Sequence, residues 1–93
     1  MGINMSSETK ELKELRRRID EMDNKIIDIL NARAELALAV RAYKLTNDLP
    51  VYDEERENKI FENLERVNDG PLSDGQLKEV YEVILKCMKD FSD

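Results

Sequence analysis

The chain has 93 residues, enough for one small domain, and its 15 basic and 21 acidic residues give a formal net charge of −6. This charge argues against a nucleic acid or an anionic membrane as the main partner, although it leaves room for a small anion in a local basic pocket. The sequence has no histidine and a single cysteine, Cys87, so we expect no metal site and no intrachain disulfide. It also has no apolar run of membrane-spanning length and no signal-peptide pattern, and we expect a cytoplasmic protein.

The first half of the chain predicts one very long amphipathic helix over residues 7–45. Apolar residues recur at steps of three and four, and neither Gly nor Pro interrupts them before Pro50. Ser6 or Ser7 is the expected N-cap, and residues 1–6, which carry no pattern, are expected to be a disordered start. At 1.5 Å per residue the helix would be about 55–60 Å long.

A second helix is predicted over residues 53–67. Asn47 and Asp48 favour a turn after the first helix, and Pro50 disfavours helical backbone at the preceding residue. Asp53 is suited to cap the new helix, and Gly70 is expected to end it in the left-handed conformation.

A third helix is predicted over residues 73–92, and it starts with a capping box of Ser73 and Gln76. No strand pattern or internal repeat is present. We therefore expect an all-α fold in a single domain over residues 1–93, with three helices per chain.

The length of the first helix also predicts an assembly. Two helices of about half its length cannot cover its apolar stripe, so part of that stripe needs another chain. A two-fold homodimer with paired long helices is the default expectation, and an extended coiled-coil interaction module is the alternative.

Charged residues interrupt the apolar stripe of the first helix. Residues spaced four and three apart form one nearly straight ridge: Leu12, Arg16, Ile19, Asp23, Ile26, Leu30, Arg33, Ala37, Val40 and Lys44. Arg16 and Lys44 lie near its ends, where long side chains can cover apolar surface and still reach water. Arg33 lies deep inside the ridge, where an unpaired charge is costly.

Two interpretations of this ridge stay open. In the structural one, Arg33 forms a buried ion pair with Asp23 or Glu57, and Asp53 is only a helix cap. In the functional one, the cations line a pocket, with Glu57 on the inward ridge of the second helix and Arg56 on the neighbouring ridge. Such a pocket suits a small ligand with two or more carboxylates, because a guanidinium can bind each one through two hydrogen bonds.

Distances along the helix favour a pocket shared between chains. Arg33 and Lys44 are about 16 Å apart along the axis, so both side chains can reach one ligand. Arg16 is about 25 Å from Arg33, which is too far within one chain. In an antiparallel dimer, however, Arg16 of one chain can lie near Arg33 of the other.

Five segments in order, LRRRIDEMDNKI, NARAEL, YK, PVYDEERE and NDGPLS, closely resemble the all-helical AroQ class of chorismate mutase. The resemblance runs from about Glu11 to Phe91. It implies an intertwined all-helical homodimer with two shared active sites. It also implies an isomerase that converts chorismate to prephenate in one pericyclic step, in the shikimate route to Phe and Tyr, without cofactor or metal.

The resemblance suggests roles for individual residues of the long helix. Arg16 resembles the arginine that is donated across the dimer to a substrate carboxylate, and Arg33 resembles the arginine that binds the other carboxylate. Lys44 resembles the lysine that bonds a carboxylate and the ether oxygen, where negative charge grows as the C–O bond breaks. Asp53 and Glu57 resemble the pair that receives the ring hydroxyl, Asp53 through its backbone and Glu57 through its side chain.

Three further positions belong to the same implied site. Arg56 resembles the arginine that orders this rim and helps to hold the ring carboxylate. Met88 and Ser92 fall where the last helix of the family faces the substrate. The family usually has Gln or Glu at the position of Ser92, and this departure leaves three alternatives: a weak enzyme, a substitute group elsewhere, or a domain cut from a longer protein.

Related mutase domains occur fused to other shikimate-pathway enzymes, and a fused or associated partner is therefore an open expectation. The first functional alternative is a weakly active, mutase-like regulatory domain that binds chorismate or prephenate. The second is isochorismate pyruvate lyase, which shares the fold and the basic residues, although the rim with both Asp53 and Glu57 resembles the mutase version.

Overall fold

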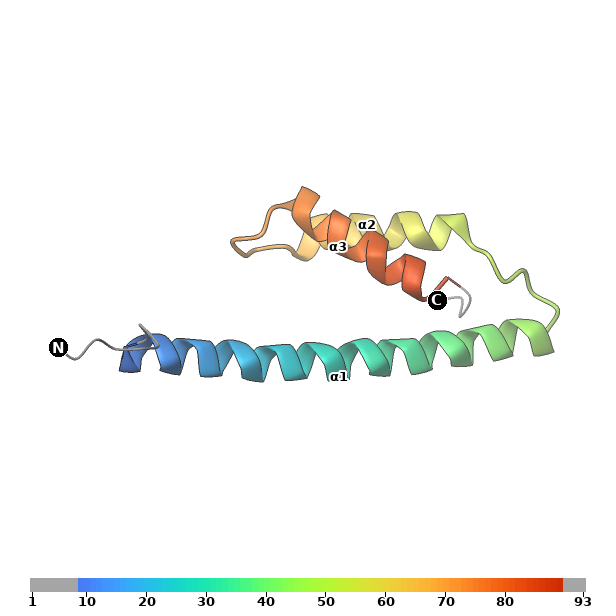
Figure 1. Ribbon diagram of the computed structural model, residues 1–93. Coiled ribbons are helices and arrows are strands. Elements are labelled where there is room, and N and C mark those ends of the chain that lie inside the picture. Colours follow the sequence, from blue (N-terminus) through green and yellow to red (C-terminus); the bar gives the residue numbers. More distant parts are fainter. Residues whose placement is uncertain (1–8, 90–93) are drawn as a thin grey trace. The chain divides into compact units, whose positions relative to one another are not determined.

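The computed structural model describes residues 9–89, and these form three α-helices and no strand (Figure 1). The helices are α1 (Lys10–Thr46), α2 (Glu54–Val67) and α3 (Asp74–Cys87). The predicted all-α class and the very long first helix are confirmed. The third helix ends at Cys87, earlier than predicted. Within the described part of the chain, no helix combines the length and the apolar character needed to cross a membrane.

The N-terminus of α1 is capped by a residue that the sequence analysis missed. The hydroxyl oxygen of Thr9 accepts a hydrogen bond from the backbone N–H of Leu12 at 3.2 Å, which satisfies one of the free donors of the first turn. The predicted caps, Ser6 and Ser7, lie outside the described residues.

The C-terminus of α1 closes with a left-handed residue. Asp48 has a φ of 55°, and the backbone N–H of Leu49 donates to the Lys44 carbonyl oxygen at 2.8 Å. This hydrogen bond, which spans five residues around a left-handed residue, is typical of a Schellman motif, in which the last carbonyls of a helix accept hydrogen bonds. The predicted turn at Asn47 and Asp48 is thus confirmed.

Asp53 caps α2 as predicted, because its extended backbone (φ −141°, ψ 94°) lets the side chain accept a hydrogen bond from the N–H of Arg56. The prediction for the other end of α2 was wrong. Gly70 does not take the left-handed conformation, and the C-cap is Asn68, whose backbone is extended (φ −67°, ψ 121°). The Asn68 amide bridges the turn to the Leu72 carbonyl (2.9 Å) and the Asp74 carboxylate (2.8 Å), so no left-handed residue is needed there.

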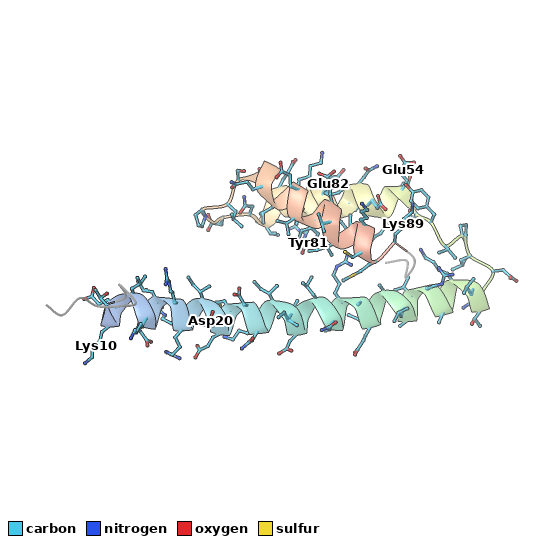
Figure 2. All side chains as sticks on the ribbon, in the orientation of Figure 1. Lys10, Asp20, Glu54, Tyr81, Glu82 and Lys89 are labelled. Atoms are coloured by element: carbon cyan, nitrogen blue, oxygen red, sulfur yellow. The ribbon has the colours of Figure 1, made fainter. Side chains whose placement is uncertain are left out.

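The capping box of α3 is confirmed. The Ser73 hydroxyl accepts from the Gln76 N–H at 3.1 Å, and the Gln76 side chain accepts from the Ser73 N–H at 2.9 Å. Charged residues on these helices, such as Glu54 on α2 and Lys89 just after α3, are exposed (Figure 2).

The chain divides into two units, and the boundary lies inside α1. In the C-terminal unit (Arg33–Asp93), α2 packs against α3 (Figure 1), and the buried apolar residues are Ala37, Ile60, Leu64, Leu85 and Met88. In the N-terminal unit (Met1–Ala32), the predicted apolar stripe of α1 is exposed. The residues more than half exposed include Leu15, Ile19, Met22, Ile26 and Ile29.

Candidate active site

Three of the predicted cations line one cavity of the C-terminal unit. This cavity, called the basic cavity here, has a volume of about 380 Å³ and is lined by Arg33, Leu36, Ala37, Val40, Lys44, Asp53 and Arg56. α1 supplies Arg33 and Lys44 from one ridge, because residues at spacings of three and four repeat on one face of a helix. The start of α2 supplies Asp53 and Arg56.

The charge of the basic cavity fits a ligand with two negative charges. Three cations against one carboxylate leave an excess of two positive charges (3 − 1 = 2). The apolar residues Leu36, Ala37 and Val40 complete the wall, and Ala37 is only 1% exposed. A small carbon skeleton with two carboxylates matches this combination of charged and apolar surface.

Arg33 also contacts Met88, the residue that caps the C-terminus of α3. Its Nη1 donates a hydrogen bond to the Met88 sulfur at 2.9 Å, and Met88 is buried. Arg33 itself is half-buried. The thioether is a weak acceptor, so this contact can orient the guanidinium without neutralising it. Met88 therefore lies next to a predicted site residue.

Lys44 is held by the linker between α1 and α2. Its ammonium nitrogen donates to the Val51 carbonyl oxygen at 3.1 Å, and both residues are half-buried. Val51 could not be predicted from the sequence, because a backbone carbonyl accepts a hydrogen bond whatever side chain the residue carries. Only the path of the linker reveals it.

Asp53 is both a helix cap and a cavity residue, the two roles that the sequence left as alternatives. It caps α2 through a 3.1 Å hydrogen bond from the Arg56 N–H, and it lines the basic cavity. Arg56 lines a second, smaller cavity of about 190 Å³ as well, together with Arg33, Lys59, Ile60, Asn63, Leu64 and Tyr81. The other polar residues of this smaller cavity, Lys59, Asn63 and Tyr81, were not among the predicted site residues.

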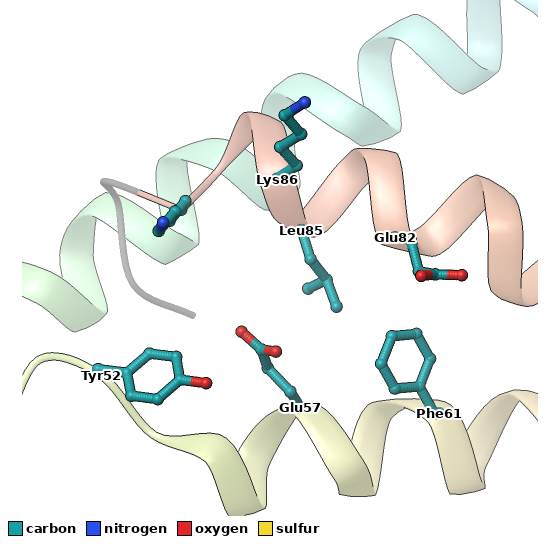
Figure 3. A pocket seen from close by; sticks show the side chains of 7 residues that line it. Tyr52, Glu57, Phe61, Glu82, Leu85 and Lys86 are labelled. Carbon is teal, nitrogen blue, oxygen red and sulfur yellow. The ribbon is translucent and has the colours of Figure 1, made fainter.

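Glu57 is not brought into the basic cavity. It lines a separate cavity of about 460 Å³, together with Tyr52, Phe61, Glu82, Leu85, Lys86 and Lys89 (Figure 3). Successive residues of a helix point about 100° apart, so Arg56 and Glu57 cannot face the same wall. Glu57 is four residues after Asp53, a spacing that puts two residues on the same face only within a helix. Asp53 precedes α2 and has extended backbone, so the two side chains do not share a face.

Glu57 acts electrostatically on Tyr52. The Tyr52 hydroxyl points toward the Glu57 carboxylate, whereas Lys86 extends away from it (Figure 3). The negative charge of Glu57 raises the pKa of the Tyr52 phenol above its ordinary value of 10.0, with smaller contributions from desolvation and Glu54. Ionisation of the Tyr52 phenol is therefore disfavoured by the neighbouring carboxylate.

Two further predicted site residues are not among the residues that line the basic cavity. Arg16 is an exposed residue of the N-terminal unit. Ser92 lies outside the described residues. Among residues 9–89, no group of three or more His, Cys, Asp or Glu side chains is arranged to hold a metal ion.

Residues 15–92 match the sequence profile of chorismate mutase type II. The chain belongs to this family. A bifunctional chorismate mutase/prephenate dehydratase of Aquifex aeolicus is 39% identical over 84 residues, which are 85% of this chain and 23% of that protein. A chorismate mutase of Methanocaldococcus jannaschii is 36% identical over 58 residues, which are 62% of this chain and 59% of that protein.

Solved structures of the family share the fold. A chorismate mutase from Helicobacter pylori in complex with prephenate has a TM-score of 0.79 and 30% identity, and the match covers 90% of this chain and 91% of that one. Form II of the chorismate mutase from Thermus thermophilus has a TM-score of 0.83 and 26% identity, covering 87% and 92%. The resemblance stated from the sequence is thus confirmed. The chain spans less than two thirds of the length of the two curated relatives described above.

Proposed function

We propose that this chain is a chorismate mutase domain that converts chorismate to prephenate without a cofactor. The observation that carries the proposal is the basic cavity, where three cations and an apolar wall meet in a member of the chorismate mutase type II family. The H. pylori relative was solved in complex with prephenate, a dicarboxylate of the kind that this cavity suits.

The proposed mechanism is positioning combined with electrostatic stabilisation. Arg33 and Arg56 bind carboxylates of the substrate, and this holds the enolpyruvyl side chain against the ring. The ether C–O bond then breaks while a C–C bond forms within the same molecule, so no proton or electron leaves the substrate. Lys44 stabilises the negative charge that grows on the ether oxygen, and its hydrogen bond to the Val51 carbonyl places the ammonium group beforehand.

The remaining predicted residues have supporting roles in this proposal. Asp53 receives the ring hydroxyl at the rim of the basic cavity, and Met88 orients Arg33 through its thioether. Glu57 reaches the hydroxyl only after its side chain turns from the separate cavity that it lines. Ser92 is proposed to contact the substrate from the last segment of the chain.

We further propose that the active form is a two-fold homodimer. The exposed apolar stripe of α1 in the N-terminal unit supports this, because residues such as Ile19 (58% exposed) and Ile29 (66% exposed) need a partner surface. An antiparallel partner brings Arg16 of one chain to the basic cavity of the other. Each active site would then contain residues of both chains.

A second candidate is a regulatory domain that binds chorismate or prephenate but turns over poorly. It is favoured by Ser92, because the resemblance puts this residue where the family usually has Gln or Glu. The bifunctional relatives of A. aeolicus and Stutzerimonas stutzeri, of which the chain matches 23% and 24%, are larger proteins that carry a second activity in their names. Either candidate is compatible with fusion or association with a prephenate-processing enzyme.

One assay separates the candidates. Purified protein is mixed with chorismate, the loss of chorismate absorbance is followed, and the product, an isomer of the same mass, is identified by chromatography and by its acid-catalysed decay. Formation of prephenate at a protein-dependent rate supports the mutase. Binding of prephenate without turnover supports the regulatory domain, and release of pyruvate from isochorismate would point to the lyase. The proposal would be contradicted if the protein converted neither chorismate nor isochorismate and did not bind prephenate.

A further inference from the structure

Lys44 is held at both of its ends by the segment that follows it. Its backbone carbonyl accepts a hydrogen bond from the N–H of Leu49 at 2.8 Å, and its ammonium nitrogen donates to the Val51 carbonyl at 3.1 Å. Residues 47–53 therefore form a short segment, called the clamp here, that binds both the backbone carbonyl and the side chain of Lys44. The same segment ends at Asp53, which lines the basic cavity together with Lys44.

The course of the clamp depends on Asp48. Pro50 has a φ restricted to about −65°, and the residue before a proline is confined to extended backbone, so Leu49 and Pro50 have little freedom. Asp48, in contrast, occupies the left-handed region with a φ of 55°. This single unusual conformation turns the chain so that the Val51 carbonyl faces back toward Lys44.

We propose that Asp48 is a positioning residue for the Lys44 ammonium group, and that it acts through its left-handed backbone and not through its charge. The proposal rests on the proposed role of Lys44 in the mutase reaction. Glycine adopts a positive φ without penalty and asparagine tolerates it, whereas a β-branched residue is strongly disfavoured there. With such a residue at position 48, the linker relaxes and the Val51 carbonyl moves away from Lys44.

The test compares three variants at one position. Asp48→Val should lower kcat/KM for chorismate by about tenfold, the effect expected from strain at a left-handed residue. Asp48→Asn, which removes the charge, and Asp48→Gly, which removes the side chain, should both stay within about threefold of wild type. All rates are measured well below the Tm of each variant, with the helix content checked by circular dichroism. A normal kcat/KM for Asp48→Val, with only a lower Tm, would overturn the proposal.

A second readout does not depend on activity. The rate at which acetic anhydride acylates Lys44, measured by peptide mass spectrometry against exposed Lys13, reports how well the ammonium group is held. Asp48→Val should raise the relative reactivity of Lys44, and Asp48→Gly should leave it unchanged. Unchanged labelling in Asp48→Val would overturn the clamp. If labelling changes while wild-type protein converts no chorismate, the clamp stands and the proposed function fails.

A double-mutant cycle completes the experiment. In a Lys44→Ala background, Asp48→Val should cause no further loss of kcat/KM or of prephenate affinity, because the group that it displaces is already gone. Fully additive losses would show that Asp48 acts on the site independently of Lys44, which contradicts the assignment.

Discussion

Arg33 and Lys44 are the two cations that α1 contributes to the basic cavity, and the structure holds each of them by a different contact. Met88 accepts from Arg33, and the Val51 carbonyl accepts from Lys44. We expect Arg33→Ala and Lys44→Ala each to lower kcat/KM by at least about 10²-fold, because a lost donor to a developing or bound anion costs roughly 3–4 kcal/mol. Lys13→Ala, on the exposed side of α1, is the matched control. Near-normal turnover would contradict the site, and unfolding of Arg33→Ala would favour a buried ion pair instead.

Tyr52 offers a pH-dependent test at the same scale. Its phenol has a pKa above 10.0, chiefly because of the Glu57 carboxylate, whereas the unfolded chain has the ordinary value. Because this shift comes from repulsion between the phenolate and Glu57, the free energy of unfolding is unaffected below the ordinary pKa and falls as the pH rises from there through the folded value. A phenolate absorbance titration, assigned with Tyr52→Phe, should show that Tyr52 titrates above its ordinary value. Glu57→Gln should move that titration to lower pH, and no movement would mean that the two groups do not face each other in solution.

At the scale of helices, Asp53 connects the start of α2 to the basic cavity. Asp53→Asn keeps a cap oxygen but removes the charge, whereas Asp53→Ala removes both. We expect Asp53→Ala to lower the free energy of unfolding by about 1 kcal/mol and Asp53→Asn to lower it much less. If Asp53 receives the substrate hydroxyl through its backbone, as the resemblance implies, Asp53→Asn should keep its activity, whereas a role of the side-chain charge would make both variants lose activity. Thermal unfolding and steady-state kinetics on the same samples measure the two roles separately.

Ser73→Ala is the control for that comparison, because Ser73 caps α3 and does not line the basic cavity. It should also cost about 1 kcal/mol of stability, while kcat/KM per folded molecule stays at the wild-type value. A loss of activity equal to that of Asp53→Ala would mean that helix stability alone explains the effect of the Asp53 variants.

At the scale of the whole molecule, the exposed stripe of α1 and the position of Arg16 predict active sites shared between chains. Arg16→Ala and Arg33→Ala should each be nearly inactive when refolded alone. Refolded together in equal amounts, half of the dimers are mixed, and each mixed dimer has one intact site of two. Activity should return to about a quarter of wild type. Sedimentation and mass spectrometry of differently labelled chains verify mixing, and no recovery in mixed dimers would show that Arg16 does not complete the partner's site.

The spacing of apolar residues and the capping residues were sufficient to predict the three helices. The spacing of apolar residues predicted all three, and Asp53 and Ser73 marked two starts correctly, because these effects act over three or four residues. Helix ends were harder to predict. Gly70 was expected to be left-handed because glycine permits it, but the Asn68 side chain bridges that turn, and Asp48 takes the left-handed position in the other linker.

The sequence by itself determined the fold class, the family and the ridge that carries Arg33 and Lys44, because helical spacing places residues on a face whatever lies opposite. Only the tertiary structure decided which groups meet across segments. It brought Asp53 and Arg56 to that ridge, placed the buried Met88 sulfur against Arg33, and turned Glu57 toward Tyr52 and a separate cavity. The hydrogen bond from Lys44 to the Val51 carbonyl could not be predicted from the sequence either. The path of a linker depends on backbone torsions, which side-chain identity only biases.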